Sequence, residues 1–350
     1  MRSVLFFPFR RASLSLSLIV LLIIGMGIFY TIPSSPPQIQ RAHAAPTLST
    51  ASFSQCSTVA GIYWESGKTN WLPCYDTGQL LKVDFTTDPA TTTTYGLSGS
   101  GVPTFELFSA WGDTNNIYLV QRGQSTGVAK LWKFVKSSGT VSELSSSFTG
   151  TANFVTVLNG YAYVGYQGGV GKVDVSTGAT TAISTTPSNQ MSGIMHDGTL
   201  VFATELEGGK IWEINPSTNT ATLRVSGLNR PLGIYVTATD IYVAENVAGG
   251  GAKKISRSTW TVTNTATLGG STRPYGVIVV GSVAVISSAA NADTNVYLRR
   301  ASDLTTTGLA TTSLNSGKVT LMLQSDGSSV FVGFMGSAGI IKIDGVTGTL

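Results

Sequence analysis

The stretch RPLGIYVTATDIYVAENVAGGGAKKISRST, residues 230–259, decides the fold of this 350-residue chain. It contains an apolar strand, a short polar turn, a second apolar strand, a glycine-rich loop and a third, alternating strand. Its opening returns as RPYGVIVVG from Arg273. A strand–turn–strand unit that recurs along a chain is typical of a repeat architecture.

The unit recurs at an almost constant period. The centre of its second strand falls at Leu72, Tyr118, Ala162, Val201, Tyr242, Ala284 and Phe331. Successive spacings are 46, 44, 39, 41, 42 and 47 residues, which is the length of a four-stranded propeller blade. Each unit also has an apolar first strand, an alternating third strand such as KIWEIN and a threonine-rich fourth strand such as TATLRV.

One four-stranded sheet cannot bury both of its faces, whereas seven sheets in a ring bury each face against a neighbour. We therefore predict an all-β fold over residues 45–350, a single seven-bladed β-propeller of four-stranded antiparallel blades. The seventh unit stops at GVTGTL, early in its fourth strand. Residues 46–53, PTLSTASF, have strand composition. We expect them to complete the seventh blade and close the ring.

Residues 1–44 have the layout of a signal peptide or an N-terminal membrane anchor. Arg2, Arg10 and Arg11 precede an apolar run over residues 14–32, and an A-x-A cleavage pattern ends at Ala44. The run is long enough to span a bilayer. Two alternatives therefore remain: cleavage after Ala44, or an uncleaved N-terminal membrane anchor. Both alternatives place the rest of the chain outside the cytoplasm, secreted or tethered at the surface. The sequence has no N-x-[ST] site with a permitted middle residue, which favours a bacterial source.

The charge balance argues against one class of partner. The chain has 22 basic and 18 acidic residues, and four of the basic residues but no acidic one precede Ala45. The remainder therefore has no net charge and no basic surplus to contact phosphates, so we do not expect nucleic acid as a partner. We expect membrane contact only through the N-terminal segment, if it is uncleaved.

Cys56 and Cys74 are the two cysteines of the chain. They lie near the start and the end of one predicted hairpin. In an oxidising compartment such a pair can form a disulfide, and two unpaired thiols are the alternative. We favour the disulfide.

Two segments resemble known propeller repeats. Residues 227–258 resemble NHL and YVTN-type repeats in having a proline before a Gly-aliphatic strand, a YVA strand and then KI. Residues 196–222, HDGTLVFATELEGGKIWEINPSTNTAT, resemble a blade of the streptogramin-lyase-like (virginiamycin B lyase) propellers, which share DG-x-L-W-F-T-E. The resemblance covers most of residues 45–350 at the level of blades. It implies the propeller scaffold, which hosts many unrelated functions.

In propellers the loops between blades and those between second and third strands gather on one face around the axis, here called the top face. Polar residues on these loops are Thr104, Gln121, Arg122, Asn153, Tyr166, Gln167, Asn189, Gln190, Glu205, Glu207, Asn229, Arg230, Glu245, Asn246, Arg273, Asn291, Asp293 and Lys318. We select Glu205, Glu245, Asn246, Asn229, Arg230, Arg273, Asn189 and Gln190 as candidate ligand-binding residues.

Glu205 and Glu245 follow the second strands of neighbouring blades. With Asn246 they offer oxygen ligands for Ca²⁺ or Mg²⁺, and the related gluconolactonase-type propellers hold a divalent ion near the axis with carboxylates and an asparagine. The competing interpretation, which we favour, pairs both glutamates with Arg230 and Arg273 in the adjoining loops.

The sequence lacks an evident acid–base set. His196 is the only histidine after Ala44 and lies in a turn on the opposite face, which argues against the histidine chemistry of the streptogramin lyases. The leading hypothesis is therefore a non-catalytic module that binds a protein, a small molecule or a carbohydrate on its top face. One alternative is a divalent-metal-dependent enzyme of the lactonase or streptogramin-lyase kind. A second is a structural component of the cell envelope.

Overall fold

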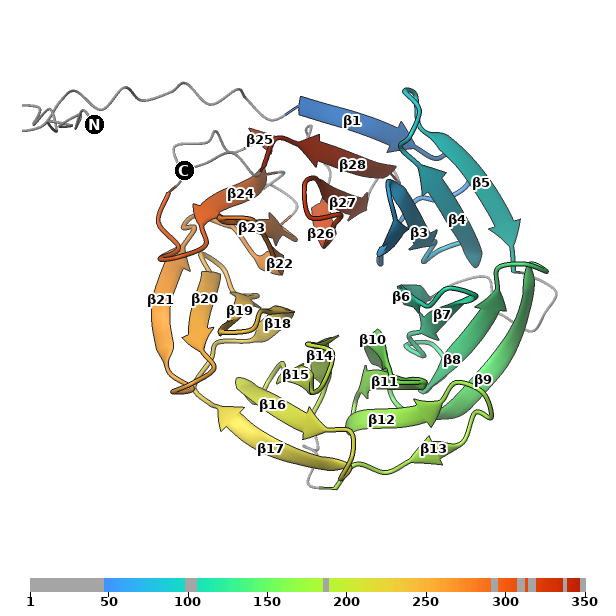
Figure 1. The fold of residues 1–350 in the computed structure, drawn as a ribbon, viewed down its shortest axis with the longest axis horizontal. Helices are drawn as coiled ribbons and strands as arrows, with labels where there is room; N and C mark the ends of the chain where they lie inside the picture. Colours follow the sequence, from blue (N-terminus) through green and yellow to red (C-terminus); the bar gives the residue numbers. More distant parts are fainter. Residues whose placement is uncertain are drawn as a thin grey trace, which may run out of the picture. The chain divides into compact units, whose positions relative to one another are not determined.

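The computed structural model describes residues 47–97, 106–184, 189–290, 295–306, 312–313, 319–335 and 339–346. Seven four-stranded antiparallel sheets form a ring in which each sheet is one blade (Figure 1). This confirms the predicted fold class. These described ranges contain no helix, and so none that could cross a membrane. The predicted signal or anchor segment lies outside them.

Within each blade the strands follow one another from the axis outward (Figure 1). Blade 1 contains β2 (Tyr63–Ser66), β3 (Thr69–Pro73), β4 (Gln79–Asp84) and β5 (Thr91–Gly96). Blade 2 contains β6 (Leu107–Gly112), β7 (Asn116–Gln121), β8 (Val128–Val135) and β9 (Thr140–Thr149). Blade 3 contains β10 (Ala152–Leu158), β11 (Tyr161–Tyr166), β12 (Gly169–Asp174) and β13 (Thr180–Thr181).

The remaining blades repeat this order. Blade 4 contains β14 (Met191–His196), β15 (Val201–Glu205), β16 (Lys210–Asn215) and β17 (Thr220–Val225). Blade 5 contains β18 (Pro231–Val236), β19 (Asp240–Glu245), β20 (Gly251–Ser256) and β21 (Val262–Thr267). Blade 6 contains β22 (Pro274–Val280), β23 (Val283–Ser288), β24 (Asn295–Arg300) and β25 (Thr312–Ser313). Blade 7 contains β26 (Val319–Ser325), β27 (Val330–Met335), β28 (Gly339–Asp344) and β1 (Thr47–Ser52).

Blade 7 joins the two ends of the described propeller. β1 pairs antiparallel with β28, from Thr47 opposite Asp344 to Ser52 opposite Gly339 (Figure 1). The first strand in sequence is thus the outer strand of the last blade, at the place given to residues 46–53 by the sequence pattern. The pairing covers an edge that β28 would otherwise expose. Behind it, Ala51 and Phe53 join a core cluster with Phe331.

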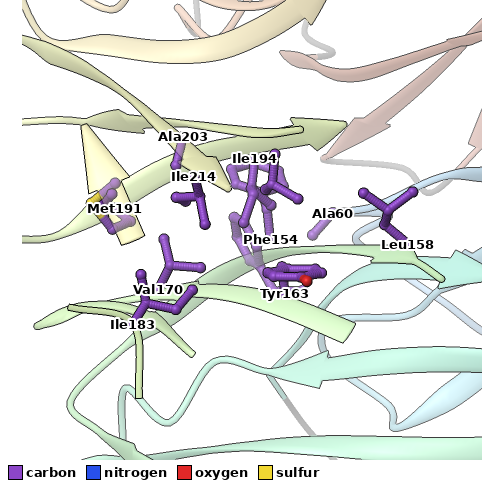
Figure 2. Packing of buried hydrophobic residues seen from close by; sticks show 13 residues of the cluster. Ala60, Phe154, Leu158, Tyr163, Val170, Ile183, Met191, Ile194, Ala203 and Ile214 are labelled. Atoms are coloured by element: carbon purple, nitrogen blue, oxygen red, sulfur yellow. The ribbon is translucent and has the colours of Figure 1, made fainter. Parts of the chain in front are cut away.

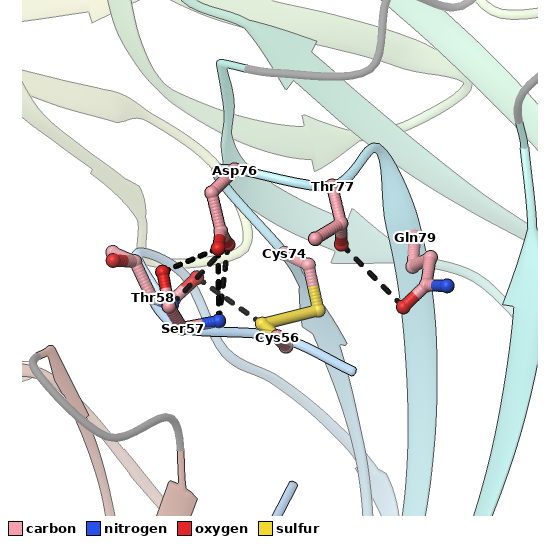
Figure 3. Close-up of a disulfide and its surroundings, with 7 residues drawn as sticks. All are labelled: Cys56, Ser57, Thr58, Cys74, Asp76, Thr77 and Gln79. Carbon is pink, nitrogen blue, oxygen red and sulfur yellow. Dashed lines mark hydrogen bonds between the residues drawn. A yellow bond between two sulfur atoms is a disulfide. The ribbon is translucent and has the colours of Figure 1, made fainter. Parts of the chain in front are cut away.

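A disulfide holds the chain where it passes from blade 7 into blade 1. Cys56 and Cys74 are bonded, with their Cα atoms 5.6 Å apart (Figure 3). Beside them, the carboxylate of Asp76 accepts hydrogen bonds from the backbone N–H of Ser57, at 2.9 Å, and from its hydroxyl. A cross-link across 18 residues stabilises a fold by about 3 kcal/mol. It therefore reinforces the junction at which the ring closes.

Apolar side chains fill the space between neighbouring blades. Figure 2 shows one such cluster, in which Tyr163 and Val170 of blade 3 meet Ile194 and Ile214 of blade 4. Tyr163 and Ile214 have no exposed surface. Burying a side chain of this size contributes about 1.5–3 kcal/mol. Since each cluster needs two blades, the core belongs to the ring rather than to any single sheet.

The innermost strand has a register shift at the same place in six blades, typical of a β-bulge. In β14 and β18 the shifted segment contains Gly193 and Gly233. A Cβ on Gly233 would lie 2.5 Å from the carbonyl oxygen of Tyr275, and one on Gly193 would collide with that of Leu232. Glycine thus lets the inner strands converge, and the bulges redirect neighbouring side chains toward the axis.

We expect deletion of residues 45–54 to destabilise the propeller strongly. The deletion removes β1, exposes the edge of β28 and takes the buried side chains of Ala51 and Phe53 from the core. Chemical denaturation should show a loss of about 3 kcal/mol or more in the free energy of unfolding. Leu48→Ser, at an exposed position of the same strand, should change it by less than about 0.5 kcal/mol. Equal stability of the deleted and intact chains would contradict ring closure by β1.

Candidate functional site

One backbone hydrogen bond is repeated around the top face. The residue that follows the second strand of a blade donates its N–H to a carbonyl of the loop entering that blade. Arg122 donates to Glu106 at 2.8 Å, and Asn246 donates to Arg230 at 3.0 Å. The donors of this bond, here called the rim residues, are Tyr75, Arg122, Gln167, Leu206, Asn246 and Ala289. Because the same bond fixes each of them, they occupy equivalent places around the axis.

A second set of residues comes from the bulges of the inner strands. Phe108 and Asn153 each stand between two paired positions of their strand, and the other blades show the same shift. The residues placed in this way, here called the bulge residues, are Phe108, Asn153, Ser192, Leu232 and Tyr275. In a regular strand, successive side chains point to opposite faces of the sheet. The bulge interrupts this alternation and changes the direction in which these side chains point.

The bulge residues and four rim residues line one cavity on the top face. Its volume is about 400 Å³, within the range of small-molecule sites. The rim residues in its wall are Arg122, Leu206, Asn246 and Ala289, and the wall is completed by Phe154, Gln190, Glu207 and Arg230. We call this the top-face cavity.

Buried polar atoms without partners gather around this cavity. Arg122 Nε, Asn153 Oδ1 and Arg230 Nε are buried and make no hydrogen bond within the described part of the chain. Asn153 is only 5% exposed, and its amide nitrogen donates to the carbonyl of Met191 at 3.1 Å. An unpaired buried polar atom costs about 1–3 kcal/mol. Of the eight such atoms among the described residues, three belong to residues that line this one cavity, which makes it a candidate site.

The cavity holds one uncompensated positive charge. Arg230 forms an ion pair with Glu207 at 2.6 Å, whereas Arg122 has no ion pair among the described residues. The guanidinium carbon of Arg122 lies 4.7 Å from the ring centroid of Phe108, which is a cation–π contact. Burial raises the pKa of Tyr275, and the positive charge of Arg122 opposes that rise.

Aromatic rings form part of the wall beside Arg122. Phe108 meets Tyr75 and Phe154 edge to face, with ring centroids 6.2 and 5.7 Å apart. Phe154 and Tyr275 also line a second, narrower cavity of about 120 Å³ deeper in the ring. We call this the channel cavity. The two rings therefore stand between a cavity lined by Arg122, Arg230 and Glu207 and a cavity with no charged lining residue.

Three of the eight candidates selected from the sequence line the top-face cavity: Gln190, Arg230 and Asn246. Asn189 donates instead to Glu205 at 2.6 Å, and the backbone N–H of Asn229 donates to Glu245 at 2.7 Å. Arg273 is exposed and does not line the cavity. Of the wider set of loop residues, Thr104, Asn291, Asp293 and Lys318 lie outside the described residues.

The predicted pairing of the two glutamates with Arg230 and Arg273 is wrong. Glu205 has no exposed surface and lies 3.5 Å from Lys210 Nζ, the residue directly opposite it on β16. Trp212 Nε1 also donates to it, at 2.8 Å. Glu245 pairs with Lys253 of β20 at 2.9 Å. Lys210 is directly opposite Glu205, and such pairs lie about 5 Å apart. Lys253 is opposite Val243, so it reaches Glu245 diagonally from the neighbouring strand.

The predicted metal ligands have other partners in the structure. Within the described ranges, no group of three or more His, Cys, Asp or Glu could hold a metal ion. Glu205 and Glu245 are each occupied by a lysine and by N–H donors, and Asn246 donates to the carbonyl of Pro274. Their donor sets therefore do not fit a Ca²⁺ or Mg²⁺ site with several free oxygen ligands.

His196 lies at the end of β14 away from the top-face cavity. Its ring is 5.4 Å from that of Trp111, and its Nδ1 accepts a hydrogen bond from the N–H of Gly198 at 3.1 Å. Burial lowers the pKa of His196, so the neutral ring persists at pH 7. These contacts are those of a residue that closes a turn.

The residues selected from the sequence overlap only in part with those that line the top-face cavity. Arg122 and Asn153 were in the wider set of loop residues but not in the selected eight, and Phe108 and Tyr275 were in neither. A usable signal is present in the repeated RPLG and RPYG segments, which place Leu232 and Tyr275 between a proline and a glycine. Aligning the blades on that segment would have marked the bulge.

Comparisons with known proteins support the fold alone. No protein-family model matches the chain, and no curated protein matches it. A catalytically inactive virginiamycin B lyase from Staphylococcus aureus, solved with quinupristin, is similar in structure, with a TM-score of 0.69 and 13% identity over 85% of this chain and 99% of that one. A streptogramin B lyase gives a TM-score of 0.70 and 12% identity over 87% and 100%. The WD40 propeller domain of Doa1 gives 0.68 and 10% over 86% and 97%.

We expect Glu205→Ala to destabilise the protein by about 3–5 kcal/mol, because it leaves Lys210, Asn189 and Trp212 without their common acceptor. Glu205→Gln should cost less, since Gln121 of blade 2 accepts from Trp132 Nε1 at 3.2 Å in the same way. Chemical denaturation measures both.

Glu207→Ala is the matched control. The side chain of Glu207 is 57% exposed, and its removal should change the free energy of unfolding by less than about 1 kcal/mol. If Glu205→Ala were as mild as this control, Glu205 would not be a structural anchor.

Proposed function

We propose that the protein binds a small organic molecule in the top-face cavity and does not transform it. The observation that carries this proposal is the gathering of Arg122, Asn153 and Arg230, each with an unpaired buried polar atom, in the wall of one cavity of about 400 Å³. A ligand that hydrogen-bonds these side chains or their neighbouring atoms would offset a cost that the fold otherwise carries.

The composition of the cavity wall favours binding over catalysis. None of its lining residues within the described ranges is a histidine or cysteine, and its one carboxylate, Glu207, is paired with Arg230. The hydroxyl of Ser192 donates to the carbonyl of Pro231 at 2.6 Å, so it is not hydrogen-bonded to a general base. Nucleophilic and acid–base catalysis both need a nucleophile or proton donor beside such a base.

The location of this binding activity is proposed from the sequence and the disulfide. The first 44 residues have the layout of a secretory signal or an anchor, and Cys56 and Cys74 are bonded, which suits an oxidising compartment. The protein would then act outside the cytoplasm, secreted or tethered by its N-terminal segment. The similar lyase structure with quinupristin is a case of this scaffold in complex with a small molecule.

Filling the cavity should abolish ligand binding. Ala289 is half-buried in the cavity wall, and its N–H is held by the carbonyl of Arg273 at 2.7 Å. Ala289→Trp keeps that backbone bond and places a large ring in the opening. In a screen of small organic compounds, hits on the unmodified protein should perturb the side-chain amide NMR signals of Asn153, Gln190 and Asn246. These hits should bind Ala289→Trp at least tenfold more weakly.

Ala238→Trp, in a turn at the opposite end of blade 5, is the control for the added ring. It should leave the same hits unaffected. A screen without hits that perturb those amides, or hits that bind Ala289→Trp undiminished, would contradict a binding function of the top-face cavity.

A further inference from the structure

We infer that the ligand of the top-face cavity is an amphipathic carboxylate, with one carboxyl group and a phenyl-sized or short alkyl group a few bonds away. This inference rests on the proposed binding function and adds the chemical class of the ligand. The juxtaposition of a lone guanidinium with a neighbouring cavity that has no charged lining residue carries it.

The charge of the cavity selects a single anionic group. Among the charged lining residues, Arg230 is neutralised by Glu207, which leaves Arg122 as the one cation without a partner in the described chain. Arg122 is half-buried against Phe108. A guanidinium held on an aromatic ring keeps its N–H groups in a fixed plane. That geometry matches the two oxygens of a carboxylate, with which arginine forms paired charge-assisted hydrogen bonds.

The lining and the volume of the channel cavity indicate the apolar group of the ligand. Its wall includes Ile194, Ile234, Val277, Ile278, Met322 and Leu323. Gln324, Tyr235 and Tyr275 also line it, and no charged side chain does. Its volume of about 120 Å³ is close to that of an engineered cavity of about 150 Å³ that binds benzene. A phenyl ring or a short alkyl group therefore matches its size and chemistry.

The two cavities meet at Phe154 and Tyr275, which line both of them. Phe154 is also in edge-to-face contact with Phe108, the ring with which Arg122 makes its cation–π contact. The positive charge of Arg122 also acts on Tyr275. A ligand with its carboxylate on Arg122 thus has its apolar group directed past these rings toward the channel cavity.

The test compares three probes on the purified full-length protein by isothermal titration calorimetry at constant ionic strength. 4-Phenylbutyrate carries both groups, 4-phenylbutyramide lacks the charge, and butyrate lacks the ring. A charge-assisted hydrogen bond is worth about tenfold or more in affinity. We expect 4-phenylbutyrate to bind at least about tenfold more tightly than either of the other two probes.

Arg122→Gln should remove the preference for the acid over the amide and leave the affinity for 4-phenylbutyramide within about twofold. Arg300→Gln is the matched control, because it removes an exposed arginine that pairs with Asp303 at the opposite end of blade 6. It should retain the full preference. Amide signals of Asn153 and Gln190 report in each case whether the probe occupies the top-face cavity.

The outcomes separate this inference from the proposed function. Equal binding of acid and amide in the top-face cavity, or an acid preference that survives Arg122→Gln, overturns the inference and leaves the binding function standing. The same conclusion follows if 4-phenylbutyrate does not bind while compounds without a carboxylate bind in the top-face cavity. If no compound of any class perturbs those amides, the proposed function fails, and this inference fails with it.

Discussion

The structure depends on a single constraint: a four-stranded sheet of this sequence can bury its faces only against another copy of itself. Each cluster between blades contains residues of at least two sheets, as with Tyr163 of blade 3 and Ile214 of blade 4. A ring satisfies the constraint for every blade at once, provided that the last blade is complete. β1 completes it by pairing with β28, and the Cys56–Cys74 disulfide follows directly at the junction with blade 1.

The candidate site is a consequence of the same repetition. Each inner strand must approach the axis, where space allows only glycine at positions such as Gly233. The bulges that permit this approach turn a nearby residue toward the axis, and the repeated N–H to carbonyl bond places a rim residue beside it. The scaffold therefore offers equivalent positions around one opening. The side chains at these positions differ from blade to blade, and among the described residues that line the cavity Arg122 is the charged one without an ion pair.

The sequence was sufficient for the fold because the period, the alternation and the turn residues are local signals that all repeat. It also indicated that residues 46–53 would close the ring, since the seventh unit lacked a strand. The residues of the candidate site were harder to predict from the sequence. Glu205 and Glu245 looked available because the sequence does not show that Lys210 and Lys253 lie across the sheet from them. Phe108 and Tyr275 looked like ordinary strand residues because a shift of one residue in register changes the face on which a side chain lies.

The environment of Arg122 also could not be predicted from the sequence. The repeat predicts that Arg122 follows a second strand. It does not predict that Arg122 lacks an ion-pair partner among the described residues, because this depends on Glu207 pairing with Arg230 in the neighbouring blades. Burial of Asn153 with an unpaired Oδ1 is likewise a property of the assembled ring. Residues of four blades thus create an electrostatic environment that no single repeat contains.

The central proposal is that this axial opening binds an amphipathic carboxylate. A crystal structure of the protein soaked with 4-phenylbutyrate tests it most directly. We expect density for the ligand with its carboxylate oxygens in the top-face cavity, about 3 Å from the guanidinium nitrogens of Arg122, and with its ring past Phe154 and Tyr275 in the channel cavity. Density at any other place on the protein, or an empty top-face cavity at saturating ligand, would contradict it.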